Sequence, residues 1–80
     1  MSDEGMSAAE ALRVRVGDLV TARPLWNAST RHEKIDIPTA VLATKEERAC
    51  QSGVMLQVRL KNGTRRWLSA GWFVPNLRRP

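Results

Sequence analysis

The chain of 80 residues contains no tyrosine, one histidine and one cysteine. Because Cys50 has no partner cysteine, the chain cannot form an internal disulfide, which indicates a reducing compartment or a fold that is indifferent to redox conditions. One histidine and one cysteine are too few for the clustered ligands of a zinc site. No apolar run approaches the ~18 residues of a membrane-spanning helix, and residues 1–5 are acidic where a signal peptide would be basic. We therefore expect a cytoplasmic protein with no membrane partner, metal or cofactor.

The residue types that carry out catalysis are also sparse. His32 and Cys50 could approach each other in space, but no third group that would orient them as a nucleophilic pair is evident. Glu46 and Glu47 are adjacent in a polar segment, which is typical of a solvated loop. The five glycines are isolated turn residues and form no phosphate-binding loop. The sequence predicts a binding protein, not an enzyme.

The charge is unevenly distributed along the chain. Residues 1–10 contain three acidic residues and no basic one, whereas residues 11–80 contain all thirteen Lys and Arg against five acidic residues, a net charge of +8. Ten of the thirteen are arginines, whose planar donors suit phosphate and carboxylate groups. The acidic leader is compatible with a solvated tail or with a segment that folds back over the basic body. The basic body favours an anionic partner.

The N-terminal third of the chain combines helical and strand signals. Ser7-Ala8-Ala9-Glu10 matches a capping box, which predicts one or two helical turns up to Leu12. The apolar residues from Leu12 to Val16 alternate with Arg13 and Arg15, which predicts a strand. After the Gly17-Asp18 turn signal we expect a strand over residues 19–22.

The remainder of the chain favours strands. Residues 24–38 lack periodicity and predict a long loop that Trp26 anchors to the body. Strands are expected over residues 39–44 and 54–61, separated by a polar connection. The second of these alternates strictly: the predicted inward residues are Val54, Leu56, Val58 and Leu60, and the predicted outward residues are Met55, Gln57, Arg59 and Lys61. Residues 69–71 suggest one turn of 3₁₀ helix, followed by a last strand over residues 72–74.

Asn62-Gly63 is a strong hairpin signal between the strand over residues 54–61 and a returning strand over residues 64–68. A two-residue turn would place Arg59 opposite Arg66 and Val58 opposite Trp67. Because opposed residues share a face, Arg59, Lys61 and Arg66 would lie outside and Trp67 inside. The like-charge pair is compatible with an anionic partner, and equally with arginines that diverge into water. A three-residue bulged loop would shift this pairing.

These elements predict a mainly β fold: a small five-stranded antiparallel barrel over residues 13–75, an acidic leader with a short helical turn over residues 1–12, and a basic tail over residues 76–80. The chain resembles the SH3-like barrel superfamily in its Tudor-type layout over about residues 14–75. The matching segments are residues 16–22 in the first strand, Trp26 after it, Ala40-Val41 in the second strand, residues 58–63 in a strand and hairpin, and residues 72–75 at the close of the barrel.

The resemblance implies a binding module. Tudor-type domains hold methylated lysine or arginine in an aromatic cage. This chain departs from that pattern, because with Trp67 inward at most two aromatic side chains remain for a cage. Plasmid-encoded dihydrofolate reductases also use an SH3-like barrel, but their Val-Gln-Ile-Tyr motif is absent here.

Two function hypotheses follow from these features. The first is a weakly sequence-selective, salt-sensitive nucleic-acid-binding module that contacts phosphate; its residues are Arg59, Lys61, Arg65 and Arg66, extended by Arg13, Arg15, Arg78 and Arg79. The second is a protein-interaction module that docks an acidic or extended partner segment, with apolar contacts from Trp26, Trp72 and Met55. A homodimer through those three residues is compatible with either hypothesis. Exposed tryptophans beside the hairpin arginines would favour base stacking.

Overall fold

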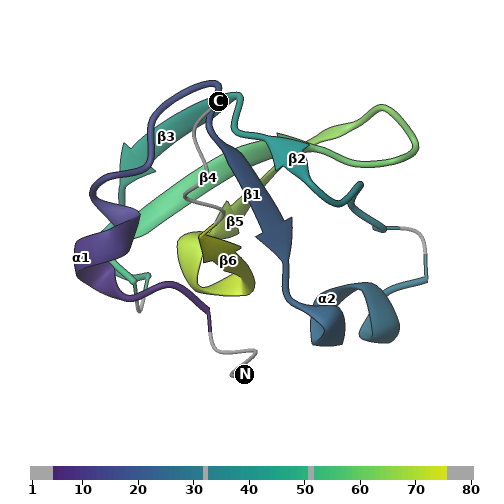
Figure 1. Ribbon diagram of the computed structural model, residues 1–80, viewed down its shortest axis with the longest axis horizontal. Helices are drawn as coiled ribbons and strands as arrows, with labels where there is room; N and C mark the ends of the chain where they lie inside the picture. The colour runs from purple at the N-terminus through teal and green to yellow at the C-terminus, as the bar shows by residue number, and fades with distance from the viewer. Residues whose placement is uncertain (1–4, 32, 51, 76–80) are drawn as a thin grey trace.

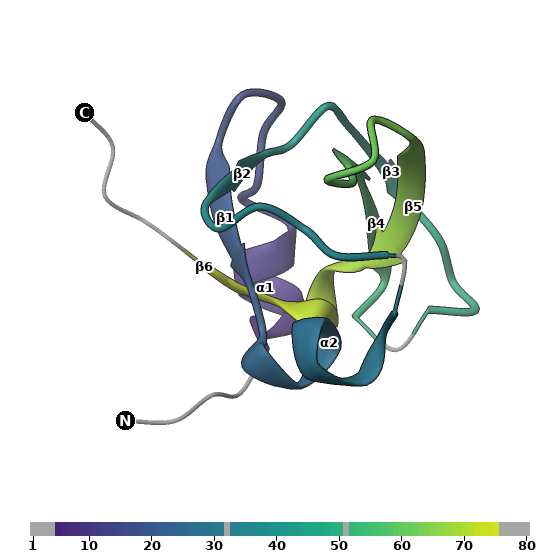
Figure 2. The same ribbon diagram turned by 90° about the vertical axis from the view of Figure 1, so that its right-hand side faces the viewer.

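The computed structural model describes residues 5–31, 33–50 and 52–75. Within these ranges the strands form two three-stranded antiparallel sheets that enclose the core between them (Figures 1 and 2), which confirms the mainly β prediction. The first sheet has the order β2-β1-β6, formed by Thr39–Ala40, Leu19–Ala22 and Phe73–Pro75. The second has the order β3-β4-β5, formed by Ala43–Glu46, Val54–Arg59 and Arg65–Ser69. Ladder pairing across these described strands does not close them into one continuous barrel.

The helix α1 (Ala8–Ala11) confirms the predicted capping box, because the Ser7 hydroxyl accepts from the Glu10 amide while the Glu10 carboxylate accepts from the Ser7 amide. The strand expected over residues 12–16 is wrong. The chain continues there through turns, and Asp18 fixes one of them by accepting a hydrogen bond from the Arg15 amide at 3.0 Å. Leu12 and Val16 are therefore about two thirds exposed, at 66% and 65%.

The segment over residues 24–38 is not a plain loop, because it begins with the helix α2 (Pro24–Ser29). Pro24 is at the first helical turn, where its missing N–H costs nothing. Trp26 anchors the segment as predicted: its side chain is 7% exposed, and its indole N–H donates to the Glu33 carbonyl at 2.9 Å. Asn27 bonds both backbone groups of Ile35, and the segment thereby folds back on itself.

The single strand expected over residues 39–44 is divided between the sheets as β2 and β3. Val41, between them, is fully buried, and its amide donates to the Asp18 carbonyl. The next amide, of Leu42, donates to Gln57 in the other sheet. This apolar stretch bends at the core and so forms hydrogen bonds with both sheets. The strand β3 continues to Glu46, so Lys45 is a strand residue.

The β4–β5 hairpin has a three-residue loop, not the predicted two-residue turn. The Gly63 amide donates to the Leu60 carbonyl, the Leu60 amide donates to Thr64, and Gly63 has φ +91°. Arg59 consequently lies opposite Arg65, and Gln57 lies opposite Trp67. A one-residue shift exchanges the faces of the returning strand, so Trp67 is on the outer face and the predicted inward position is wrong. The inward set of β4 and Leu60 is buried as predicted.

The 3₁₀ turn η1 (Ala70–Trp72) occurs where the sequence predicts it and leads into β6, which pairs with β1. Phe73 is fully buried, and its carbonyl accepts from the Met6 amide, so the N-terminal segment lies along β6. Among the described residues, no helix has the length and apolar character needed to cross a membrane. Asp3 and Glu4 in the leader, and Arg78 and Arg79 in the tail, lie outside the described residues.

Candidate functional site

One face of the β3–β4–β5 sheet points away from the core and carries only positive charge. Opposed strand residues share a face, so the pairing register defines its members. We call it the outer sheet face; it consists of Ala43, Lys45, Met55, Gln57, Arg59, Arg65, Trp67 and Ser69. Its three charged members, Lys45, Arg59 and Arg65, are all exposed. An extended, uniformly cationic surface of this kind suits an anionic partner.

Trp67 lies in the middle of the outer sheet face, where it is half-buried and opposite Gln57. Lys45 reaches across β4 from β3, and its ammonium nitrogen is 4.6 Å from the centroid of the Trp67 ring. At that distance the cation is attracted by the ring electrons. The face therefore combines an aromatic surface with a flexible cation over it.

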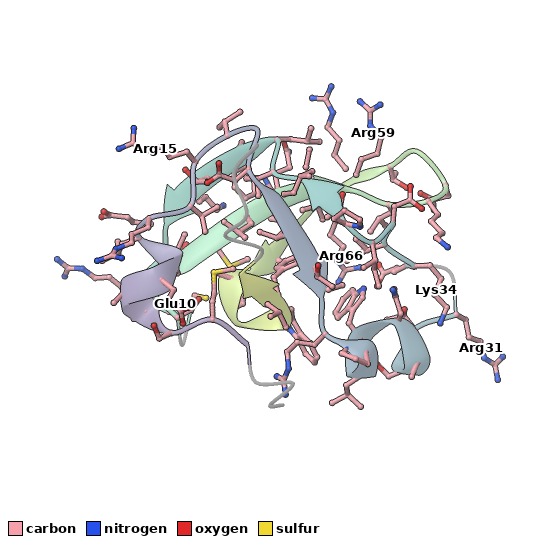
Figure 3. All side chains as sticks on the ribbon, viewed as in Figure 1. Glu10, Arg15, Arg31, Lys34, Arg59 and Arg66 are labelled. Carbon is pink, nitrogen blue, oxygen red and sulfur yellow. The ribbon has the colours of Figure 1, made fainter. Side chains whose placement is uncertain are left out.

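Arg59 and Arg65 lie one strand repeat beyond Trp67, directly opposite each other. Both are exposed, and in the part of the chain that the structure describes neither has an acidic partner within salt-bridge distance. Figure 3 shows the Arg59 side chain extending outward from the molecule. The two guanidinium groups are thus accessible to phosphate.

Arg66 does not belong to this surface, which corrects its predicted outward position. The shifted register places it opposite Val58, and its guanidinium forms an ion pair with Glu33. The same group lies 5.9 Å from the centroid of the Trp26 ring, beside α2 (Figure 3). Glu33 and Trp26 therefore hold Arg66 to the segment that follows β1.

Lys61, Arg13 and Arg15 also lie off the outer sheet face. Lys61 is in the hairpin loop, with its ammonium nitrogen 4.0 Å from a carboxylate oxygen of Asp36. Arg13 and Arg15 are exposed in the turns after α1, and Figure 3 shows Arg15 at the α1 end of the molecule, away from Arg59. Eight arginines and lysines were predicted to contact phosphate, and six of them lie within the described residues. Of these six, only Arg59 and Arg65 share the outer sheet face.

The three predicted apolar contact residues differ in exposure. Trp26 is buried and packs edge-on against Trp72, with ring centroids 5.1 Å apart, so it cannot be a surface contact as predicted. Trp72 is half-buried, and the Arg23 guanidinium lies 6.0 Å from its centroid. Met55 is half-buried on the outer sheet face. Partial exposure thus remains at Trp72 and Met55.

A hollow of about 350 Å³ continues the outer sheet face beyond Ser69. It is lined by Arg23, Cys50, Met55, Ser69, Gly71 and Trp72. The Cys50 sulfur is 3.0 Å from the Ser69 hydroxyl oxygen and 3.1 Å from that of Ser52. Burial alone would raise the pKa of the Cys50 thiol, but hydrogen bonds with the Ser52 and Ser69 side chains and with the backbone of Ser52 and Gly53 leave the pKa below its usual value.

A lowered thiol pKa increases the thiolate fraction at neutral pH. His32, the other member of the nucleophilic pair considered above, lies outside the described residues. Among the residues that are described, no three His, Cys, Asp or Glu side chains are grouped closely enough to hold a metal ion.

Sequence reasoning missed Lys45 and Trp67. Lys45 follows the apolar run over residues 39–44, so the pattern predicts it in the polar connection and not in a strand. Trp67 is predicted in the core only if Asn62-Gly63 forms a two-residue turn, and the observed loop has three residues. A glycine at the third position of a three-residue loop was the signal that could have corrected the register, since that position requires positive φ.

Comparison of the chain with protein-family models, with curated proteins and with solved structures found no match. The resemblance to SH3-like barrels therefore stays a prediction from the sequence.

Proposed function

We propose that this protein is a nucleic-acid-binding module of the SH3-like type, with the phosphate backbone held against the outer sheet face. The fold assignment is supported by the order of the elements: a long segment after the first strand, a tight hairpin, and one 3₁₀ turn before the last strand. The role is binding, with no catalytic step.

The observation that carries the proposal is the opposed, uncompensated pair Arg59 and Arg65 on a face whose only other charge is Lys45. Like charges directly opposite each other in a sheet cost stability. A phosphate between the two guanidinium groups would remove that repulsion, and its neutralisation would release counterions. The ligand gains affinity from both effects.

Binding of this kind is weakly selective for sequence, because phosphate contacts position a nucleic acid without reading its bases. It is also salt-dependent. If three cations contact the phosphates of a single strand, the slope of log affinity against log salt is about −2. Affinity then falls about twenty-fold between about 50 and about 200 mM salt.

Fluorescence anisotropy with a labelled mixed-sequence oligonucleotide tests the proposal at these two salt concentrations. Replacing both Arg59 and Arg65 by Gln should reduce the magnitude of the slope by about 1.4 and weaken binding at low salt. The matched control replaces Arg15 and Arg31 by Gln, which removes the same charge from two positions that do not belong to the outer sheet face and lie apart from Arg59 (Figure 3). Equal weakening by the two double variants, or no binding by the unmodified protein, would refute the proposal.

The hollow beside Met55 and Trp72 favours a second candidate, a protein-interaction module. An apolar side chain of an extended partner would enter the hollow, and an acidic neighbour would meet Arg23 at its edge. A second copy of the chain is one such partner. Light scattering detects a homodimer, and Trp72→Leu should abolish peptide or dimer binding while leaving oligonucleotide affinity unchanged.

A further inference from the structure

Trp67 lies on the outer sheet face, so its ring is not part of the hydrophobic core. Its side chain is half-buried on the outer sheet face, while Leu68, the next residue, fills the core on the other side of β5. Among the described residues, the only charged group over the ring is the Lys45 ammonium, whose nitrogen is 4.6 Å from the ring centroid. A flat partner that displaced this ammonium would contact the ring directly.

The relative strengths of the two contacts favour displacement. An exposed cation–π contact contributes about two- to five-fold to an equilibrium constant. Stacking of a nucleobase on an aromatic side chain contributes about five- to 150-fold. Lys45 is exposed and its side chain is long, so its ammonium can move from the ring to a neighbouring phosphate. The phosphate would then compensate the positive charge, which the neutral ring does not. Exchange of the ammonium for a base is therefore favourable when phosphates accompany the base.

The positions of the cations match this exchange. Arg65 is two residues before Trp67 on β5, about 7 Å along the strand, and Arg59 lies opposite Arg65. Lys45 approaches the ring from the opposite edge of the sheet. A nucleotide whose base covers Trp67 would therefore have cations on two sides within reach of its flanking phosphates.

A duplex cannot use this arrangement, because its bases are paired and stacked inside the helix and present no free ring face to a flat sheet. It would contact only the three cations. We infer that the outer sheet face selects single-stranded nucleic acid, with one base stacked on Trp67 in place of the Lys45 ammonium and the adjacent phosphates held by Arg59 and Arg65. This inference rests on the proposed function and adds the class of nucleic acid to it.

The test compares four ligands of equal length with the full chain at low salt: single-stranded DNA, the RNA of the same sequence, the DNA duplex, and an abasic DNA strand that retains the phosphates. We expect a base-containing single strand to bind about ten-fold more tightly than the duplex and the abasic strand. The DNA and RNA arms identify which single strand is preferred, and the preference of either over the duplex supports the inference.

Two substitutions localise the effect. Trp67→Leu should remove the ten-fold advantage and leave affinity for the abasic strand unchanged, whereas Trp67→Phe should retain most of the advantage because a ring remains. The comparison of base-containing and abasic strands uses the unmodified protein, so it stands even if a variant fails to fold.

Equal affinity for all four ligands, lost on replacement of Arg59 and Arg65, would overturn the inference but leave the proposed function intact. Absence of binding to every ligand would overturn both.

Discussion

Arg59 and Arg65 face each other across the β4–β5 hairpin, and neither has an acidic partner within salt-bridge distance among the described residues. The pair exists because the hairpin closes through three loop residues, which brings Arg65 into the position that a two-residue turn would have given to Arg66. The molecule consequently carries a small electrostatic penalty at the edge of the outer sheet face.

Neutralising one member of this pair should increase stability while it weakens binding. For Arg65→Gln we expect a gain of up to about 0.5 kcal/mol in the free energy of unfolding at low salt, because removal of an opposed like charge relieves repulsion. Urea denaturation measures the gain, which should shrink as salt is added. A loss of stability at low salt would mean that Arg65 makes a favourable contact in the folded state.

The three-residue loop depends on Gly63, whose φ is +91°. Gly63→Ala should destabilise the protein by about 1–2 kcal/mol, because a Cβ is disfavoured in the left-handed region. Gly71→Ala is the matched control: a Cβ there would make only an ordinary contact, 3.6 Å from the Ser69 hydroxyl, so its effect should be small. Thermal unfolding measures the stabilities of the two variants, and similar midpoint temperatures would contradict the loop geometry.

Arg66 should contribute to stability and not to nucleic-acid binding, because its guanidinium is paired with Glu33 and lies over Trp26. Both side chains of the ion pair are partly exposed, so water screens their attraction. A double-mutant cycle with Arg66→Gln and Glu33→Gln should give a coupling below about 1 kcal/mol. Oligonucleotide affinity of Glu33→Gln should not rise; a large rise would show that Glu33 restrains a phosphate-binding Arg66.

Cys50 should react with iodoacetamide at lower pH in the folded protein than in the urea-unfolded chain. Burial raises the pKa of the Cys50 thiol, but hydrogen bonds with Ser52, Ser69 and the backbone lower the pKa by more than burial raises it. The thiolate therefore forms at lower pH in the folded protein. The associated stability is present above the unfolded pKa and is lost as pH falls through the folded pKa. The pH profile of the alkylation rate measures the shift.

Ser69→Ala should move that alkylation profile to higher pH, because the variant lacks the hydroxyl that hydrogen-bonds the Cys50 sulfur and lowers the pKa of the thiol. Circular dichroism verifies that the variant is folded, since Ser69 also accepts from the Gly71 amide. A folded-state profile at or above that of the unfolded chain would contradict the assigned hydrogen bonds.

Trp26→Phe should cost about 2 kcal/mol, because it leaves the Glu33 carbonyl without its indole donor and reduces buried area beside Trp72. Trp72→Phe should cost less, since Trp72 is only half-buried. Comparing the two variants by denaturation separates the core tryptophan from the surface one, and the reverse order would contradict the burial described for them.

Local sequence signals determined the elements whose stabilising contacts lie within a few residues. The capping box at Ser7 and Glu10, the alternation of β4 and the 3₁₀ turn after Ser69 were all predictable for this reason. The alternation from Leu12 to Val16 was misleading, because the Asp18 side chain, bonded to the Arg15 amide, stabilises a turn that periodicity does not reveal. The helix at Pro24 was hidden by the polar residues around it.

The tertiary structure alone decided which face of β5 is buried. Asn62-Gly63 is compatible with a two-residue turn and with a three-residue loop, and the two choices place opposite faces of the returning strand against the core. The observed register buries Leu68 against Leu56 and directs Arg66 to Glu33 and Trp26, contacts between segments far apart in the chain. The sequence thus determined that a basic hairpin is present, while long-range packing decided that Lys45, Arg59, Arg65 and Trp67 form its exposed face.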